Sequence, residues 1–302
     1  MSSFTSNMSS FKVLAALLAL APGISAALPP APAGYKLTWG DDFSGNGLPD
    51  PKNWIITTGT QYPGGAPNFG TGEVQTYTNS PKNLNIADGI LSITPLRENN
   101  KWTSARIETK RIDFVAAKGK KMRIEGSLAM PDIKGVPATG YWPAFWTLGG
   151  AFRGVYTNWP IVGEFDLMEN VNGLDKTWST LHCDINPGGK CDETNGISGN
   201  SPCGNGKPCQ GNFHTYAVVV DRSVTPEKMT FEVDGKVFNT ITETQLGAQI
   251  WANTVHGGCF ILLNLAMGGS FPNKVAGSPT PIEATKPGVP FRIQHVAVFN
   301  SV

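Results

Sequence analysis

Short segments in which apolar and polar residues alternate are spread along most of the chain, and this pattern constrains the fold more than any other feature. The clearest are Met122–Met130 and Phe291–Phe299, where apolar side chains recur at every second position. A period of two is typical of β-strands with one buried face. The sequence therefore predicts an all-β protein, with further strands at Gly89–Leu96, Ala105–Phe114, Tyr141–Leu148, Glu164–Val171, Trp178–Asp184, His214–Asp221 and Phe260–Ala266.

Turn-forming residues separate the predicted strands. The chain has 35 glycines and 23 prolines among 302 residues, and charged residues make up only 16%, against about 25% in a typical soluble domain. Lys228–Val233 and Lys236–Ile241 flank Asp234-Gly235, which predicts a tight hairpin. Only Thr242–Ala252 is expected to form a short helix. Because no repeat or linker interrupts the strands, we expect one two-sheet sandwich of the jelly-roll kind.

The N-terminal residues resemble a secretory signal peptide. Lys12 precedes the apolar run Val13–Ala21, and small residues follow it up to Ala27. The apolar run is shorter than the roughly 20 residues that a membrane-spanning helix needs. We expect cleavage near Ala26 or Ala27, so that residues 1–26 are the signal peptide and residues 27–302 form a single secreted, extracellular domain.

Several classes of function find no support in the sequence. Lys and Arg number 24 and Asp and Glu number 23, which gives a formal net charge of +1. This balance does not favour a nucleic-acid partner or an anionic membrane. The chain has no H-E-x-x-H, no phosphate-binding loop, no G-x-S-x-G and no G-x-G-x-x-G motif. We expect no cofactor and no catalytic metal.

The five cysteines agree with export to an oxidising compartment. Four of them lie in one stretch rich in glycine and asparagine, and none forms a C-x-x-C pair of the kind found in zinc sites. We expect Cys183 to pair with Cys191 and Cys203 with Cys209, which leaves Cys259 unpaired. The sequence alone leaves other pairings open.

Three carboxylates occur within six residues in an otherwise apolar segment. Glu164 and Asp166 are two apart and share a face of a regular strand, whereas Glu169 would point to the other face. One extra residue, a β-bulge at Leu167 or Met168, would return Glu169 to the first face, and bulges are frequent beside active sites. The segment is therefore predicted to place three carboxyl groups on one side of a strand.

Crowded carboxyl groups cannot all ionise without cost, so at least one keeps its proton near neutral pH. A protonated acid beside an ionised carboxylate is the pair that glycoside hydrolysis requires. Trp142, Trp146 and Trp159 lie near the carboxylates in the sequence, and sugars stack on aromatic rings. An exposed acidic strand face or a Ca²⁺ site with oxygen ligands remains the alternative interpretation.

The segment Gly163–Glu169 resembles the E-x-D-x-x-E signature of glycoside hydrolase family 16, in the form found in laminarinase-like β-1,3-glucanases and endo-1,3(4)-β-glucanases. The resemblance covers nearly all of the chain after the predicted signal peptide, and the stretch with cysteines after His182 resembles the fungal secreted type. It implies a curved jelly roll with an open substrate cleft, and hence endo attack on a polymer. Other matching segments follow in family order: Leu37–Phe43, Gly72–Thr78, Ser104–Lys110, Trp142–Trp146, Ser179–His182, Phe260–Pro272 and Phe291–Phe299.

The resemblance also implies a role for each matching residue. Glu164 would be the nucleophile, Glu169 the acid and then the base, and Asp166 a group that tunes the pair. The expected substrate-binding residues are Trp142, Trp146, Trp159, His182, Arg106, Asn68 and Trp251. Some members of the family bind calcium far from the cleft, to which the region of Asp41 and Asp42 could contribute, although the sequence does not require it.

The function that the sequence favours is a secreted, monomeric, retaining endo-β-glucanase that acts on β-1,3-glucan, with mixed β-1,3/1,4-glucan as an open alternative. A cell-wall glucan transglycosylase would use the same intermediate, with a sugar in place of water as the acceptor. A non-catalytic β-glucan-binding module or a structural wall protein would leave the three carboxylates unexplained.

Overall fold

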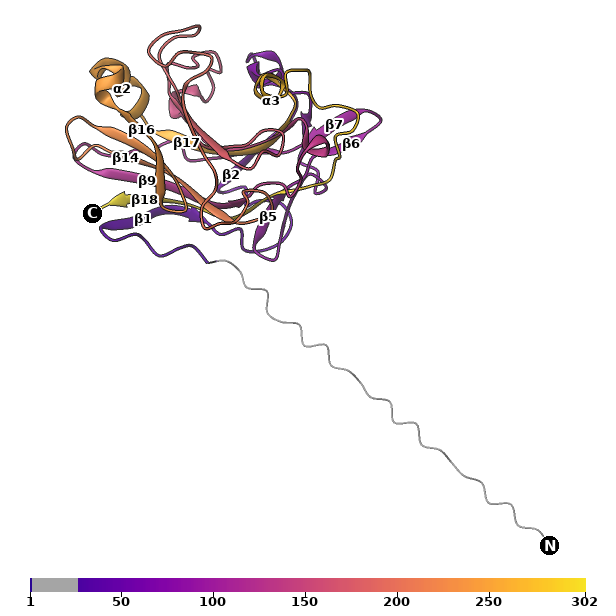
Figure 1. Ribbon diagram of the computed structural model, residues 1–302. Coiled ribbons are helices and arrows are strands. Elements are labelled where there is room, and N and C mark those ends of the chain that lie inside the picture. The colour runs from indigo at the N-terminus through magenta and orange to yellow at the C-terminus, as the bar shows by residue number, and fades with distance from the viewer. Residues whose placement is uncertain (2–26) are drawn as a thin grey trace.

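The structure is a computed structural model that describes Met1 and residues 27–302, so the predicted signal peptide and its cleavage site lie almost entirely outside the described residues. Two antiparallel sheets face each other across the core and form a sandwich (Figure 1). This architecture confirms the predicted jelly roll. No helix among the described residues has the length and apolar character needed to cross a bilayer.

The first sheet has eight strands. Its order is β16 (Lys236–Thr242), β15 (Lys228–Val233), β14 (His214–Asp221), β9 (Lys121–Ala129), β18 (Phe291–Ser301), β5 (Ile90–Ile93) and β4 (Leu84–Ala87), and β1 (Tyr35–Asp41) pairs with β18. The hairpin between β15 and β16 turns at Asp234 and Gly235, which both have positive φ, as a two-residue hairpin turn requires. The predicted hairpin is thus confirmed.

The second sheet has seven strands. Its order is β13 (Ile197–Ser201), β12 (Thr177–His182), β11 (Glu164–Glu169), β10 (Tyr141–Gly149), β17 (Cys259–Met267), β8 (Arg106–Thr109) and β2 (Trp54–Thr57). A smaller sheet joins β3 (Thr76–Tyr77), β7 (Lys101–Ser104) and β6 (Leu96–Glu98). Neighbouring strands of the seven-stranded sheet are all antiparallel.

The two faces of the seven-stranded sheet have different neighbours. On β10, Tyr141 and Phe145 belong to the main hydrophobic core between the sheets. Trp142 and Trp146 alternate with them and point to the opposite face, because successive strand residues point to opposite sides. Every residue of β17 is buried, since a second apolar cluster around Phe260 and Leu262 covers its outer face.

Helices are short and few among the described residues. The segment predicted as one helix over Thr242–Ala252 is instead two, α1 (Glu243–Leu246) and α2 (Ala248–Val255), because Gly247 between them has φ 85° and ends the first. A third helix, α3 (Ser270–Ala276), was not expected. In Figure 1, α2 and α3 both lie on the upper side of the sandwich, with α2 at its left edge. Single 3₁₀ turns occur at Pro67–Gly70, Val136–Ala138 and Gly150–Phe152.

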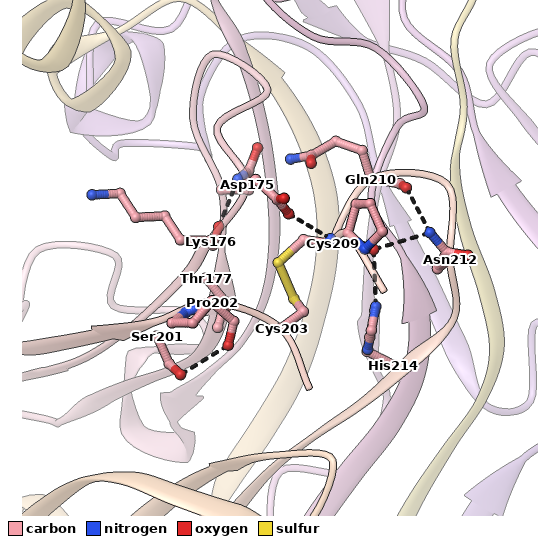
Figure 2. The surroundings of a disulfide bond; sticks show 12 residues. Asp175, Lys176, Thr177, Ser201, Pro202, Cys203, Cys209, Gln210, Asn212 and His214 are labelled. Carbon is pink, nitrogen blue, oxygen red and sulfur yellow. Dashed lines mark hydrogen bonds between the residues drawn. A yellow bond between two sulfur atoms is a disulfide. The ribbon is translucent and has the colours of Figure 1, made fainter. Parts of the chain in front are cut away.

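Both predicted disulfides are present, Cys183–Cys191 and Cys203–Cys209, and Cys259 is free and buried. Figure 2 shows the surroundings of Cys203–Cys209, where the Cys209 amide donates to Asp175 at 2.8 Å. The disulfides therefore close two separate loops after β12.

Both carboxylate oxygens of Asp41 accept hydrogen bonds within the protein. Its Oδ1 accepts the Phe43 amide, and its Oδ2 accepts the Trp54 indole N–H at 2.8 Å and the Asn53 amide group. In this structure Asp41 therefore ties β1 to the segment around β2.

Candidate active site

A β-bulge in β11 brings three carboxylates to one face of the seven-stranded sheet. Phe145 of β10 pairs with Met168, and the next residue of β10, Trp146, pairs with Asp166, so Leu167 is the extra residue. The register against β12 shifts over the same segment, between Asp166 and Glu169. The bulge was predicted at Leu167 or Met168. It returns Glu169 to the face of Glu164 and Asp166.

Each glutamate accepts a hydrogen bond from a tryptophan. The Trp159 indole donates to Glu164 Oε2 at 3.1 Å, and the Trp142 indole donates to Glu169 Oε1 at 2.8 Å. The structure thus brings these two predicted residues to the carboxylates. Such donors stabilise the ionised form of a carboxyl group and fix its orientation.

His182 faces two of the three carboxyl groups, those of Asp166 and Glu164. Its Nε2 lies 3.4 Å from Asp166 Oδ2 and 4.0 Å from Glu164 Oε1. This position follows from the sheet register, in which His182 of β12 pairs with Glu164 of β11. His182, predicted as a substrate-binding residue, therefore lies against the acidic cluster.

All three carboxyl groups resist ionisation. Burial is the main cause, and it raises the pKa of Glu164 to about 7, although the charge of His182 opposes this increase. Burial and the charge of Glu164 raise the pKa of Asp166 well above its usual range. Burial also raises the pKa of Glu169, and the hydrogen bond from Trp142 opposes it. The cluster therefore holds at least one proton at neutral pH.

The carboxylates line a cleft with a cavity volume of about 410 Å³. Its floor is the outer face of the sheet, where Trp142, Ala144, Trp146 and Leu148 come from alternate positions of β10. Aromatic side chains make up much of the remaining wall: Tyr62, Phe69, Phe152, Tyr156 and Trp159. Rings with a few polar groups between them are typical of sugar-binding sites.

Arg106 is buried in this wall rather than exposed at its edge. Its guanidinium lies 4.7 Å from the centre of the Phe69 ring and 4.8 Å from that of Trp146, and it donates to the Tyr62 hydroxyl at 2.8 Å. Its Nε is buried without a protein partner.

Three predicted substrate-binding residues do not line the cleft: Trp251, Asn68 and His182, whose imidazole instead faces Asp166 and Glu164. Trp251 is fully buried in the core, where its indole donates to Glu227 at 2.8 Å, so the structure gives it a packing position. Asn68 is exposed on the turn Pro67–Gly70, beside lining residue Phe69 but not itself part of the lining. Trp251 follows Gly247 on a helix whose inner face packs on the core, which a single tryptophan in the sequence does not reveal.

Sequence reasoning missed several residues of the cleft. Asn264 was detectable, because it is the one amide in the apolar strand β17, and it accepts the Trp146 indole N–H at 2.7 Å. Tyr62, Phe152 and Tyr156 come from loops, where no periodicity marks a buried face. Tyr62 and Tyr156 stack with ring centres 4.3 Å apart although 94 residues separate them.

Within the described residues, one set of three acidic or histidine side chains is close enough to share an ion. It consists of Glu164, Asp166 and His182, whose nearest nitrogen and oxygen atoms lie within 4.8 Å of one another. Glu164 already accepts the Trp159 indole N–H, and His182 contacts Glu193. We therefore interpret the set as an acid–base cluster and assign no metal to it.

Comparisons with known proteins agree with this site. The family model described as "XgeA-like, catalytic GH16 domain" matches residues 87–251. The crystal structure of endo-1,3-beta-glucanase from Streptomyces sioyaensis is 48% identical and has a TM-score of 0.88, and the match covers 91% of this chain and 99% of that one. The structure of endo-beta-1,3-glucanase from Pyrococcus furiosus is 27% identical with a TM-score of 0.70, over 89% and 95% of the two chains.

Among curated proteins, glucan endo-1,3-beta-glucosidase A1 of Niallia circulans is 28% identical over an alignment of 288 residues that covers 90% of this chain. The chain spans only 39% of the length of that relative. The family match covers more than half of the chain, and it falls on the strands that carry the acidic cluster. The chain belongs to glycoside hydrolase family 16.

Proposed function

We propose that residues 27–302 form a single catalytic domain that hydrolyses β-1,3-glucan internally and with retention of anomeric configuration. One observation carries this proposal: the bulge at Leu167 places Glu164, Asp166 and Glu169 together in a cleft walled by aromatic rings. The relatives named as 1,3-β-glucanases support the substrate class. Action on mixed β-1,3/1,4-glucan stays a prediction.

The proposed reaction has two steps. Glu164 attacks the anomeric carbon, while Glu169 donates its proton to the glycosidic oxygen, so that the leaving chain departs as an alcohol and a glycosyl ester remains on Glu164. Glu169, now a carboxylate, then takes a proton from water. The resulting oxygen nucleophile attacks the anomeric carbon and releases Glu164.

The position of His182 supports the assignment of Glu164 as the nucleophile. His182 Nε2 lies 4.0 Å from Glu164 Oε1, and its charge is the largest effect that opposes the raised pKa of Glu164. For Glu169, the charge of His182 ranks behind burial and the Trp142 hydrogen bond. A positive charge closer to Glu164 lowers the pKa of that group and favours the ionised nucleophile there.

Asp166 lies between the two glutamates in the sequence and holds a proton more firmly than an ordinary aspartate. Its Oδ2 is buried without a hydrogen-bond partner, and its pKa is raised well above the usual range. A neutral Asp166 removes one negative charge from the cluster. We propose that it tunes the pair in this way rather than reacting itself.

We further propose that the protein is exported after removal of residues 1–26 and acts outside the cell. The two disulfides support this location, because such bonds persist in oxidising compartments. That the protein is a monomer stays a prediction.

The test compares wild type with Glu164→Gln and Glu169→Gln on laminarin and on barley mixed-linkage glucan. Glu232→Gln is the matched control, because Glu232 is a carboxylate of the other sheet that pairs with Arg123 at 2.7 Å. We expect each cleft variant to lose at least ~10³-fold in kcat on laminarin, because the reaction has no alternative nucleophile or acid. The control should retain activity within about 2-fold, as expected for a residue that has no part in the reaction.

Azide separates the two roles. With an activated aryl glycoside, Glu164→Ala should form an α-glycosyl azide, because azide replaces the nucleophile, whereas Glu169→Ala should form a β-glycosyl azide from the enzyme-bound intermediate. Products longer than the substrate would indicate a transglycosylase. Binding without release of sugar by wild type would indicate a glucan-binding module and contradict the proposal.

A further inference from the structure

Glu193 is a fully buried carboxylate outside the proposed reaction, in the loop after β12. We propose that Glu193 is a positioning residue that holds the His182 imidazole in its charged form beside Glu164 and Asp166, and that the Cys183–Cys191 disulfide keeps Glu193 in place. The inference rests on the proposed function, because it concerns how the nucleophile remains ionised.

Both oxygens of Glu193 are engaged. Oε2 lies 2.7 Å from His182 Nδ1, and Oε1 accepts the Cys183 amide at 2.8 Å. The carboxylate side chain has no exposed surface, so His182 Nδ1 is its main source of compensating charge. Nδ1 therefore carries a proton, and Nε2 is the nitrogen that faces Asp166 and Glu164. A buried carboxylate that orients an imidazole in this way is a recurring device in acid–base catalysis.

Every titratable group that faces His182 is acidic. Nε2 faces Asp166 at 3.4 Å and Glu164 at 4.0 Å, Nδ1 faces Glu193, and Glu169 acts from farther away. The Trp159 ring lies 5.6 Å from the imidazole. Burial by itself lowers the pKa of His182, but the hydrogen bond with Glu193 and the charges of Glu164 and Glu193 raise it overall.

The loop geometry explains how Glu193 reaches this place. Cys183 directly follows His182, and Cys191 is two residues before Glu193, so the disulfide anchors the loop at both sides of the contact. The chain then passes so close to the imidazole that a Cβ on Gly196 would lie 2.9 Å from His182 Nδ1. Asn186 of the same loop lines the cleft.

The charges of His182 and Glu193 shift the pKa of Glu164 in opposite directions. The charge of His182 lowers the pKa of Glu164 more than the charge of Glu193 raises it. Replacing Glu193 by glutamine removes both charges, because the imidazole then loses its buried counterion. The pKa of Glu164 should rise, and the acid limb of the activity profile should move to higher pH.

The experiment measures kcat/KM for Glu193→Gln against pH. We expect the acid limb to move up by about 1 pH unit, with an activity loss of about 10-fold below it and little change near the top of the profile. His182→Gln should move the limb in the same direction, and the double variant should move it no further than Glu193→Gln, because the charge of His182 is already lost in Glu193→Gln. Additive shifts, or an activity loss with an unmoved limb, would contradict the inference.

The two disulfides offer a matched pair of variants. Replacing Cys183 and Cys191 by serine should move the acid limb upward, because the loop no longer fixes Glu193. Replacing Cys203 and Cys209 by serine should leave the limb in place, because that disulfide lies beside Asp175 and Tyr216 instead. Equal shifts from the two pairs would indicate general loosening and overturn the positioning role.

A second readout does not depend on activity. The chain has four histidines, so imidazole signals in nuclear magnetic resonance spectra can be assigned with His182→Gln. The His182 signal should titrate at least ~1 unit lower in Glu193→Gln than in wild type. An unchanged titration would overturn the inference even if the protein hydrolyses glucan, and a shifted one would support it even if the glucanase proposal failed.

Discussion

The two faces of the seven-stranded sheet come from the same strands but have opposite physical requirements. Toward the other sheet, Phe145 and Phe165 are buried among apolar neighbours, which favours folding. Toward the cleft, three carboxyl groups are crowded where burial raises the pKa of each, which opposes folding when they are charged. Alternation along a strand therefore separates stability from chemistry at adjacent residues.

The largest expected effect on folding comes from the core face. Phe145→Ala should lower the free energy of unfolding by about 3–5 kcal/mol, because the ring is fully buried and packs closely against Gly126 of β9. Urea unfolding measures this change. At 25 °C the folded variant should hydrolyse laminarin at a rate within a few-fold of wild type. A loss of activity with unchanged stability would contradict the division into a core face that stabilises the fold and a cleft face that carries the chemistry.

Replacing a carboxyl group on the cleft face should instead raise the free energy of unfolding. Burial raises the pKa of Glu164 from its usual value near 4.5 to about 7 in the folded protein. The folded state therefore binds this proton more tightly than the unfolded state, and the glutamate becomes destabilising as the pH rises from 4.5 through 7. Glu164→Gln should remove this cost.

We expect Glu164→Gln to be more stable than wild type by up to about 3 kcal/mol at pH 8 and nearly equal at pH 4. Thermal unfolding at the two pH values measures the difference, and Glu232→Gln on the other sheet is the control. Equal Tm differences at both pH values would show that the cleft carboxyl is not held in its protonated form by burial.

The smallest effect separates two tryptophans of the same face. The hydrogen bond from the Trp142 indole lowers the pKa of Glu169. Trp142→Phe removes this donor and should raise that pKa, so the alkaline limb of kcat/KM should move up by about half a pH unit. Trp146→Phe should leave the limb unmoved, since the Trp146 indole donates to Asn264. The comparison fails if both variants shift the limb equally.

Local patterns predicted much of this molecule. Alternation located β14 and β15 with their observed ends, the spacing of the acidic residues required the bulge, and neighbouring cysteines paired. Each of these features depends on residues close together in the sequence.

What escaped prediction depends on distant residues. Tyr62 stacks on Tyr156 across 94 positions, and the place of Trp251 in the core depends on how α2 packs. Glu193 looked like one more polar residue of a loop, because its contact with His182 exists only once the disulfide-closed segment has folded back. Such contacts produce no periodic pattern of apolar and polar residues in the sequence.

The bulge at Leu167 also determines which changes in length this active site can absorb. A strand distinguishes its faces by parity, so a single deletion elsewhere between Glu164 and Glu169 that left the bulge in place would turn one glutamate toward the core. Removing Leu167 itself would restore regular pairing and leave the two glutamates four positions apart, on the same side. A deletion that removes the bulge is thus a change in length after which both carboxylates still face the substrate.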